Sequence, residues 1–256
     1  MATYKKKQKI KTPKSEATSI EENSTTAEVF DTLDESASKS EEWVLSNQKS
    51  IFIFLGAVVI ATLGYLGYQK YVAGPNEKEA ANELAYPKKH FNEALNATGA
   101  EKDSLYTLAI EGAEGKYGFV DIVDNYSGTD AGNLAYYYAG ISYLNIKDYA
   151  QAIDYLDNFS SEDELLTPIA KGAIGDAFAN LNQPEDALNY YEQAAEARSN
   201  DFTRPLFLFK AANTALDLGD SEKALLFFED IQKNYPNSDE AKNIEVYVNK
   251  AKYAAK

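Results

Sequence analysis

The spacing of small residues between positions 140 and 224 constrains the fold more than any other feature of this 256-residue chain. Three pairs of small residues are each 12 positions apart: Gly140 and Ala152, Gly175 and Ala187, Ala212 and Ala224. From one pair to the next the distance is 35 and then 37 residues. A period of this length is typical of stacked helix pairs. We expect the two extra residues to lie near positions 203–205.

The residue types at these positions fit two antiparallel helices per repeat. Small residues let the two backbones approach, and large residues fill the space beside them. The residues predicted to pack the repeats are Gly140, Tyr143, Ala152, Gly175, Phe178, Ala187, Ala224, Phe228 and Pro236. This order resembles the tetratricopeptide repeat, with an aromatic residue, Leu-Gly, Tyr, then Ala-x-x-x-Phe and Pro. The sequence therefore predicts an all-α solenoid with three repeats at 131–236, degenerate helical repeats at 77–130 and a capping helix at 237–256.

The first helix of each repeat is expected to line a groove that binds other polypeptides. The predicted groove residues are Tyr137, Ile141, Leu144, Ile169, Asp176, Leu206, Phe209 and Asn213. Three consecutive helical residues span about 200° of the helix, so the run Tyr136–Tyr138 cannot lie wholly in the core. Tyr136 falls on a packing position and Tyr137 on the groove side. Because many of these residues are apolar, the groove is suited to apolar or unfolded polypeptide or to a partner helix. Alternatively, the helices of residues 77–125 partly fill it.

An 18-residue stretch without charges, residues 51–68, predicts one membrane-spanning helix within residues 49–72. At about 1.5 Å per residue, 18–22 residues cross a hydrocarbon core of about 30 Å. Tyr65, Tyr68 and Tyr71 cluster at one end, as aromatic residues do at membrane interfaces. Residues 1–48 are expected to be a flexible tail with a basic start and one short amphipathic helix near residues 26–37. The predicted contact with the lipid bilayer is this one span.

The segments between the span and the repeats are expected to be short and helical. Gly74-Pro75-Asn76 should end the membrane helix, and Pro87 should kink or split the helix that follows. Further helices are predicted at residues 104–110 and 116–125, with the stretch "YSGTDAGN" as a loop. The apolar spacing of residues 238–253 predicts the capping helix.

Composition argues against nucleic-acid binding and against catalysis. The net charge is −15, and all of it falls in residues 73–256, which hold 16 Lys and Arg against 31 Asp and Glu. Such a domain repels phosphate backbones. With no Cys and only His90, which we expect to be solvated, the chain offers no zinc site or Ser-His-Asp triad. Gly112, Gly115 and Gly118 lack the spacing of a dinucleotide loop. We therefore predict no enzyme and no cofactor.

The arrangement as a whole resembles the YfgM-like family of ancillary Sec translocon subunits, in its Bacteroidota form. The similarity lies in "STTAEVFDTLDESASKSEEWV" before the span, and in "GTDAGNLAYYYAGISYL" and "IGDAFANLNQPEDAL" after it. It implies a single-pass protein of the bacterial inner membrane, with a cytoplasmic N-terminus and a periplasmic repeat domain. It also implies, as partners, the SecYEG translocon, a membrane-anchored peptidyl-prolyl isomerase chaperone and exported client proteins. The implied role is that of a non-catalytic scaffold and co-chaperone.

Two other interpretations stay open from the residues alone. The repeat domain could serve as a scaffold for a different envelope complex, such as division, gliding or outer-membrane assembly components. The topology could also be reversed, because the lysines closest to the span do not decide its orientation. Lys39 and Lys49 lie on one side, and Lys70, Lys78 and Lys88 are among those on the other.

Overall fold

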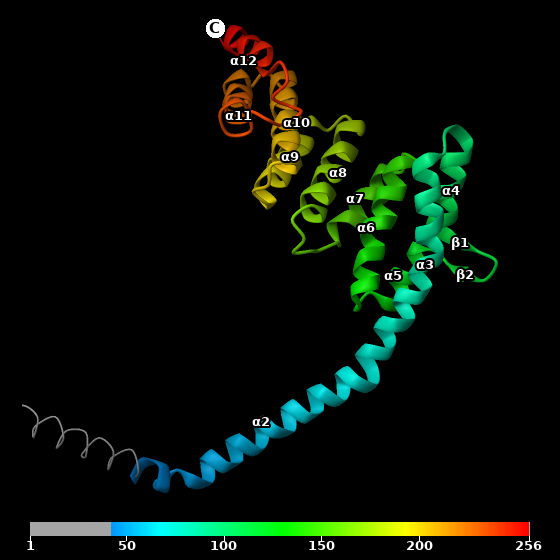
Figure 1. Ribbon diagram of the computed structural model, residues 1–256, viewed down its shortest axis with the longest axis vertical. Helices are drawn as coiled ribbons and strands as arrows, with labels where there is room; N and C mark the ends of the chain where they lie inside the picture. Colours follow the sequence, from blue (N-terminus) through cyan, green and yellow to red (C-terminus); the bar gives the residue numbers. More distant parts are fainter. Residues whose placement is uncertain (1–41, 256) are drawn as a thin grey trace, which may run out of the picture. The chain divides into compact units, whose positions relative to one another are not determined.

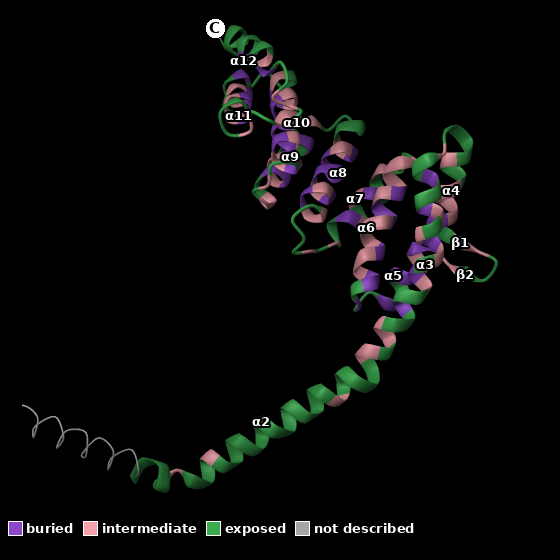
Figure 2. Ribbon diagram, viewed as in Figure 1, coloured by how far each residue is buried: buried purple, intermediate pink, exposed green. Residues whose placement is uncertain are grey.

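The computed structural model describes residues 42–255 and divides the chain into two compact units, residues 1–67 and residues 68–256. The predicted basic tail and the predicted helix near residues 26–37 lie outside the described residues. In the first unit, residues 42–46 are helical, and α2 (Gln48–Tyr68) follows. None of the residues of α2 is buried, and most of its apolar side chains are exposed (Figure 2). This helix is long and apolar enough to cross a membrane.

The helix does not end at Gly74-Pro75-Asn76, so that prediction was wrong. A π-helical turn, η1 (Gln69–Ala73), leads directly into α3 (Gly74–Asn96), and the backbone is helical from Gln48 to Asn96. The N–H of Gly74 donates to the carbonyl of Gln69, five residues back. Pro75 falls in the first turn of α3, where its missing N–H is tolerated. Pro87 lies buried inside α3 and does not split it.

The rest of the second unit is built of further helices and one small hairpin (Figure 1). The helices are α4 (Gly99–Glu111), α5 (Phe119–Tyr126), α6 (Asp130–Asn145), α7 (Tyr149–Asp157), α8 (Leu166–Asn180), α9 (Pro184–Ala197), α10 (Thr203–Asp217), α11 (Ser221–Asn234) and α12 (Ile244–Ala254). The pairs α6–α7, α8–α9 and α10–α11 are the three repeats, and they stack in chain order. The fold is thus an all-α solenoid.

The glycines at 112–118 form a hairpin, which the sequence did not predict. The strands β1 (Gly112–Ala113) and β2 (Lys116–Tyr117) are antiparallel, with Gly112 opposite Tyr117. Glu114 and Gly115 both have positive φ, which is the geometry of the tight turns that join two strands. The next helix therefore begins at Phe119 rather than at residue 116.

Each repeat joins its two helices by the same turn. One residue with positive φ stands at the same place in each: Lys147, Asn182 and Gly219. The next residue bonds back to a helix carbonyl, as Asp148 N–H does to Tyr143 and Asp220 N–H to Ala215. The side chains of Asp148 and Asp220 then accept from backbone N–H groups in the first turn of the second helix.

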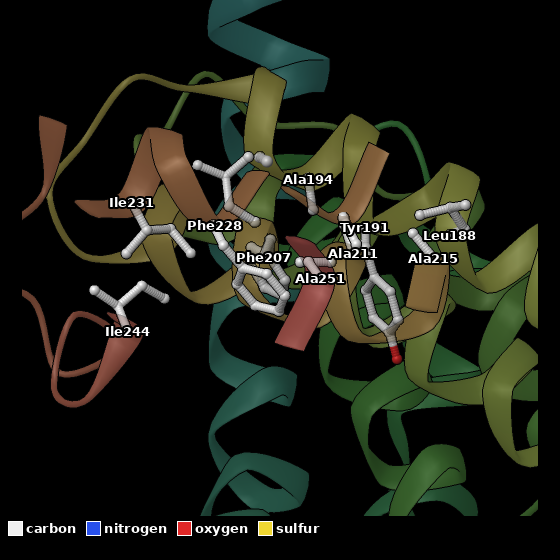
Figure 3. Close-up of a cluster of buried hydrophobic side chains, with 14 of the residues drawn as sticks. Leu188, Tyr191, Ala194, Phe207, Ala211, Ala215, Phe228, Ile231, Ile244 and Ala251 are labelled. Carbon is white, nitrogen blue, oxygen red and sulfur yellow. The ribbon is translucent and has the colours of Figure 1, made fainter. Parts of the chain in front are cut away.

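Close contact between small and large residues sets the spacing within each helix pair. A Cβ on Gly140 would overlap Leu156, and one on Gly175 would lie 2.6 Å from the Tyr191 ring. In both pairs the large residue follows the glycine by 16 positions. The third repeat has Ala212 and Phe228 at this separation, both fully buried. The cluster around Phe228 is shown in Figure 3, where Phe207, Tyr191 and Ile231 lie close by.

Three predicted boundaries differ from the structure. Residues 203–205 form the first turn of α10. The spacing is longer because α9 has 14 residues where α7 has 9, while the connection that follows is shorter, 198–202 against 158–165. The helix α6 begins at Asp130, inside the expected loop, because Thr129 caps it by accepting from Gly132 N–H. The last helix begins only at Ile244, since Asn243 before it takes a left-handed conformation.

Candidate protein-binding surface

The three groove residues predicted on α6 lie at the junction between two repeats. Tyr137, Ile141 and Leu144 are half-buried. They pack against one small cluster of buried residues, Leu156, Ala170, Ala173 and Ile174, which come from α7 and α8. Their side chains therefore join the first repeat to the second. Burial raises the pKa of the Tyr137 hydroxyl, which fits this enclosed position.

All three residues of the tyrosine run are packed, although the sequence assigned only one side of α6 to the core. Tyr136 contacts Tyr155 of α7, with ring centroids 6.0 Å apart. Tyr138 stacks on Phe119 of α5 at 5.4 Å, and Tyr137 meets Phe159 at 5.3 Å. The reason is that α3, α4 and α5 cover a further side of α6, which a single repeat would leave exposed.

The groove residues predicted on α10 are covered in part by the last helix. Leu206 and Phe209 pack against the C-terminal core, and the Phe209 ring lies 4.8 Å from that of Tyr247 on α12. The amide of Asn213 donates to the carbonyl of Phe209, one turn earlier. Phe209 on α10 thus contacts α12, the helix that follows its own helix pair. In the same way Tyr137 on α6 packs against a cluster that includes residues of α8, the helix that follows the pair α6–α7. Ile169 on α8 is half-buried.

Asp176 is the one charged residue among the predicted groove positions, and two other side chains already donate hydrogen bonds to its carboxylate. Its carboxylate accepts from Lys210 Nζ at 2.6 Å and from the Tyr191 hydroxyl at 2.7 Å. Burial and the adjacent Asp176 raise the pKa of Tyr191. This network connects α8, α9 and α10. The carboxylate of Asp176 therefore links two repeats, and its hydrogen bonds to Lys210 and Tyr191 compete with any bond to a partner.

The predicted packing residues have three kinds of environment: buried, half-buried and exposed. Ala152, Ala187, Ala224 and Phe228 have no exposed surface. Gly140 and Gly175 are buried against larger residues, while Tyr143 and Phe178 are half-buried. Pro236 is exposed, and it follows the end of α11 at Asn234. It stands where a residue without an N–H prevents the helix from continuing.

An open hollow of about 820 Å³ lies beside the start of α6, and the residues that line it include none of the predicted groove residues. Ser127, Thr129, Asn133, Phe159 and Ser160 are among the residues that line it. The first N–H groups of α6 are already satisfied, because the carboxylate of Glu77 accepts from Asp130 at 2.7 Å and from Ala131 at 3.1 Å. Glu77 thereby ties α3 to α6. The sequence gives no local signal for this contact, since the partners are more than 50 residues apart.

His90 is not solvated as predicted. It lies on α3, and only 13% of its side chain is exposed. Its Nδ1 is 3.0 Å from Glu93 Oε2, and its ring meets Tyr86 edge-on at 4.8 Å. Within residues 42–255, no three His, Asp or Glu side chains converge in a way that could hold a metal ion.

Comparison with known families agrees with the helix pairs. Two tetratricopeptide repeat family models match the chain, one at residues 134–163 and the other at residues 173–239. No curated protein matches the sequence. Tetratricopeptide repeats typically form non-enzymatic scaffolds for protein–protein interaction. The structure therefore defines a tetratricopeptide-type helical solenoid, on a chain that also has one helix long and apolar enough to span a membrane.

Proposed function

We propose that this chain is a membrane-anchored, non-catalytic scaffold and co-chaperone of the Sec translocon. In this proposal the protein crosses the bacterial inner membrane once, within residues 49–72, with residues 1–48 in the cytoplasm. The repeats at 131–236, with the helices of 77–130 before them and the cap at 237–256 after them, extend into the periplasm. Their partners are the translocon, a membrane-anchored peptidyl-prolyl isomerase chaperone and exported proteins.

One observation carries the proposal: an apolar helix with no buried residue and a stack of repeat helices occur on the same chain. No residue of α2 is buried in the structure, and lipid is the solvent that such an apolar surface fits. The second unit has a packed core and a net negative charge, as expected for a domain in water. Together they support a scaffold that acts at a membrane surface. The resemblance of the flanking segments supports the translocon as its location.

Crosslinking in intact cells tests the proposed partners. The full-length protein is crosslinked mildly, purified through a tag after Lys256, and its partners are identified by mass spectrometry. We expect translocon subunits and a peptidyl-prolyl isomerase. Recovery of division, gliding or outer-membrane assembly components without any translocon subunit would contradict the proposal.

Topology is tested separately. A reporter that is active only in the periplasm, fused after Lys256, is expected to be active. A fusion of the same reporter before Met1 is the matched control and should be inactive. Activity of the N-terminal fusion alone would reverse the assigned orientation.

A further inference from the structure

Two of the three turns that join the helices of a repeat carry an exposed leucine that packing in the core clusters does not explain. In all three repeats an aliphatic residue stands at the end of the first helix, just before the residue with positive φ: Ile146, Leu181 and Leu218. We call residues 146–148, 181–183 and 218–220 the turn edge. Leu181 is 42% exposed and Leu218 is 36% exposed. Neither is among the residues packed in the three core clusters, whereas Ile146 is half-buried against the cluster that contains Phe119.

In the view of Figure 1 the three turns lie at the same end of the repeat helices. The hydroxyl of Tyr149, the first residue of α7, donates to the Asn180 side chain at the end of α8, at 3.2 Å. The helices α8 and α10 are in direct contact, since a Cβ on Gly172 would overlap the Phe207 ring. The two leucines stand at equivalent positions, at the ends of these two helices in successive repeats.

Negative charge surrounds these leucines. The exposed acidic residues in the turns and in the first turns of the following helices are Asp148, Glu185, Asp186, Asp217, Asp220 and Glu222. Two lysines lie close to them. Lys147 is exposed, and Lys223 is held by Glu192, 2.9 Å away. The apolar side chains are thus flanked by an excess of carboxylates, so a ligand for this edge needs both apolar and basic groups.

We infer that the turn edge binds a basic amphipathic helix of a partner polypeptide, an inference that rests on the proposed scaffold function. Helices in contact pack about 8–10 Å apart, close to the roughly 10.5 Å between residues i and i+7 of one helix. Leucines seven residues apart on a partner helix can therefore reach Leu181 and Leu218 together. Lysines on its flanks then meet the carboxylates of the turns. This mode of recognition uses the apolar face for affinity and the charges for selectivity.

Binding of a defined peptide tests the inference. The full-length protein in lipid nanodiscs is titrated against a fluorescent 18-residue helical peptide with leucines at positions i, i+4, i+7 and i+11 and lysines elsewhere. Binding to empty nanodiscs is subtracted. The double variant Leu181→Ser, Leu218→Ser should bind the peptide at least about tenfold more weakly, because both apolar contacts with the peptide are lost. The same peptide with glutamates in place of lysines should not bind.

A matched variant separates this surface from general apolar exposure. Leu226 on α11 and Val246 on α12 are 67% and 65% exposed and lie outside the turn edge. Leu226→Ser, Val246→Ser should leave the peptide affinity unchanged. Equal losses in the two double variants, or no loss in the turn-edge variant, would overturn the inference. Circular dichroism of both variants shows whether helix content is retained.

The crosslinking experiment distinguishes the two levels of the proposal. If translocon subunits are recovered by the wild type but the peptide does not bind the turn edge, the inference fails and the proposed function stands. If the peptide binds at the turn edge and no translocon subunit is recovered, the proposed location fails while the binding surface stands.

Discussion

The glycines of α2 and those of the repeat helices show how differently the two regions use the same residue. Around Gly56, Gly64 and Gly67 of α2, an added Cβ would meet nothing within 4 Å. At Gly140 and Gly172 it would overlap a neighbouring side chain. The glycines of the repeats are therefore required by helix packing, whereas no described part of the chain requires a glycine at these positions of α2.

The apolar residues of the two regions differ in the same way. Phe54 in α2 is 68% exposed, while Phe228 in α11 has no exposed surface. An apolar helix that is exposed all round is stable only in an apolar solvent, whereas the repeat helices bury one face against each other. The following predictions test this contrast in order of expected size.

Removing a core aromatic side chain should have the largest effect. Phe228→Ala is expected to lower the free energy of unfolding of the repeat domain by about 3–5 kcal/mol, because it opens a cavity in a close-packed core. Chemical denaturation of the full chain in detergent, followed by circular dichroism, measures it. The matched variant Phe54→Ala should leave the unfolding of the repeats unchanged. Similar losses in the two variants would contradict the contrast.

Adding one methyl group at a helix contact should have the next largest effect. Gly172→Ala is expected to cost about 1–3 kcal/mol, since the new Cβ must displace the buried ring of Phe207. The same denaturation experiment compares it with Gly64→Ala, which should be neutral. A larger loss from Gly64→Ala would instead reveal a close helix partner in the membrane.

Polar contacts between repeats should contribute less. Asp176→Ala removes the partner of Lys210 and of the Tyr191 hydroxyl, and we expect it to cost about 1–2 kcal/mol because both groups are only partly solvated. Asp239→Ala, which removes the exposed contact with Lys242, should show no measurable change. If both variants behave alike, the Asp176 network does not hold the repeats together.

The smallest expected effect is a dependence on alkaline pH. Burial, followed by the nearby Tyr143 and carboxylates, raises the pKa of Tyr155 to about 12. A tyrosine whose pKa in the folded state exceeds its ordinary value near 10 stabilises the fold below that value. This contribution is lost as the pH rises from 10 to 12. Tyr155→Phe should therefore flatten the fall in unfolding free energy over this range, and it should remove one late step from the tyrosinate absorbance titration. An unchanged slope would place Tyr155 in an ordinary environment.

Regular spacing made the helix pairs predictable, while unusual local geometry did not. The 12-residue separation of Gly175 and Ala187 is enough to identify the two helices of a repeat from residue types alone. The continuous helix through Gly74 and Pro75 could not be predicted, because the π turn that accommodates the proline is a backbone adjustment without its own sequence signal. The hairpin at residues 112–117 was missed because its strands have two residues each.

The candidate surface was harder to predict than the fold. Helical periodicity assigns Tyr137 and Phe209 to a face other than the packing face of their own repeat. Helical periodicity does not reveal that the helix after each pair covers that face. The contact between Phe209 on α10 and Tyr247 on α12 is an example. By contrast, Leu181 and Leu218 occupy equivalent positions in two repeats, so an alignment of the turns could have identified the turn edge from the sequence.

By itself the sequence determined the class of structure: an apolar helix long enough for a membrane and a set of helix pairs with a defined period. These follow from patterns within about 35 residues, because helix periodicity and small-to-large pairing act locally. Only the tertiary structure decided which faces stay open. Whether Tyr137, Asp176 or Leu181 can meet a partner depends on neighbours from other helices, and stacking of the repeats buries some surfaces that are equally apolar in sequence while leaving others exposed.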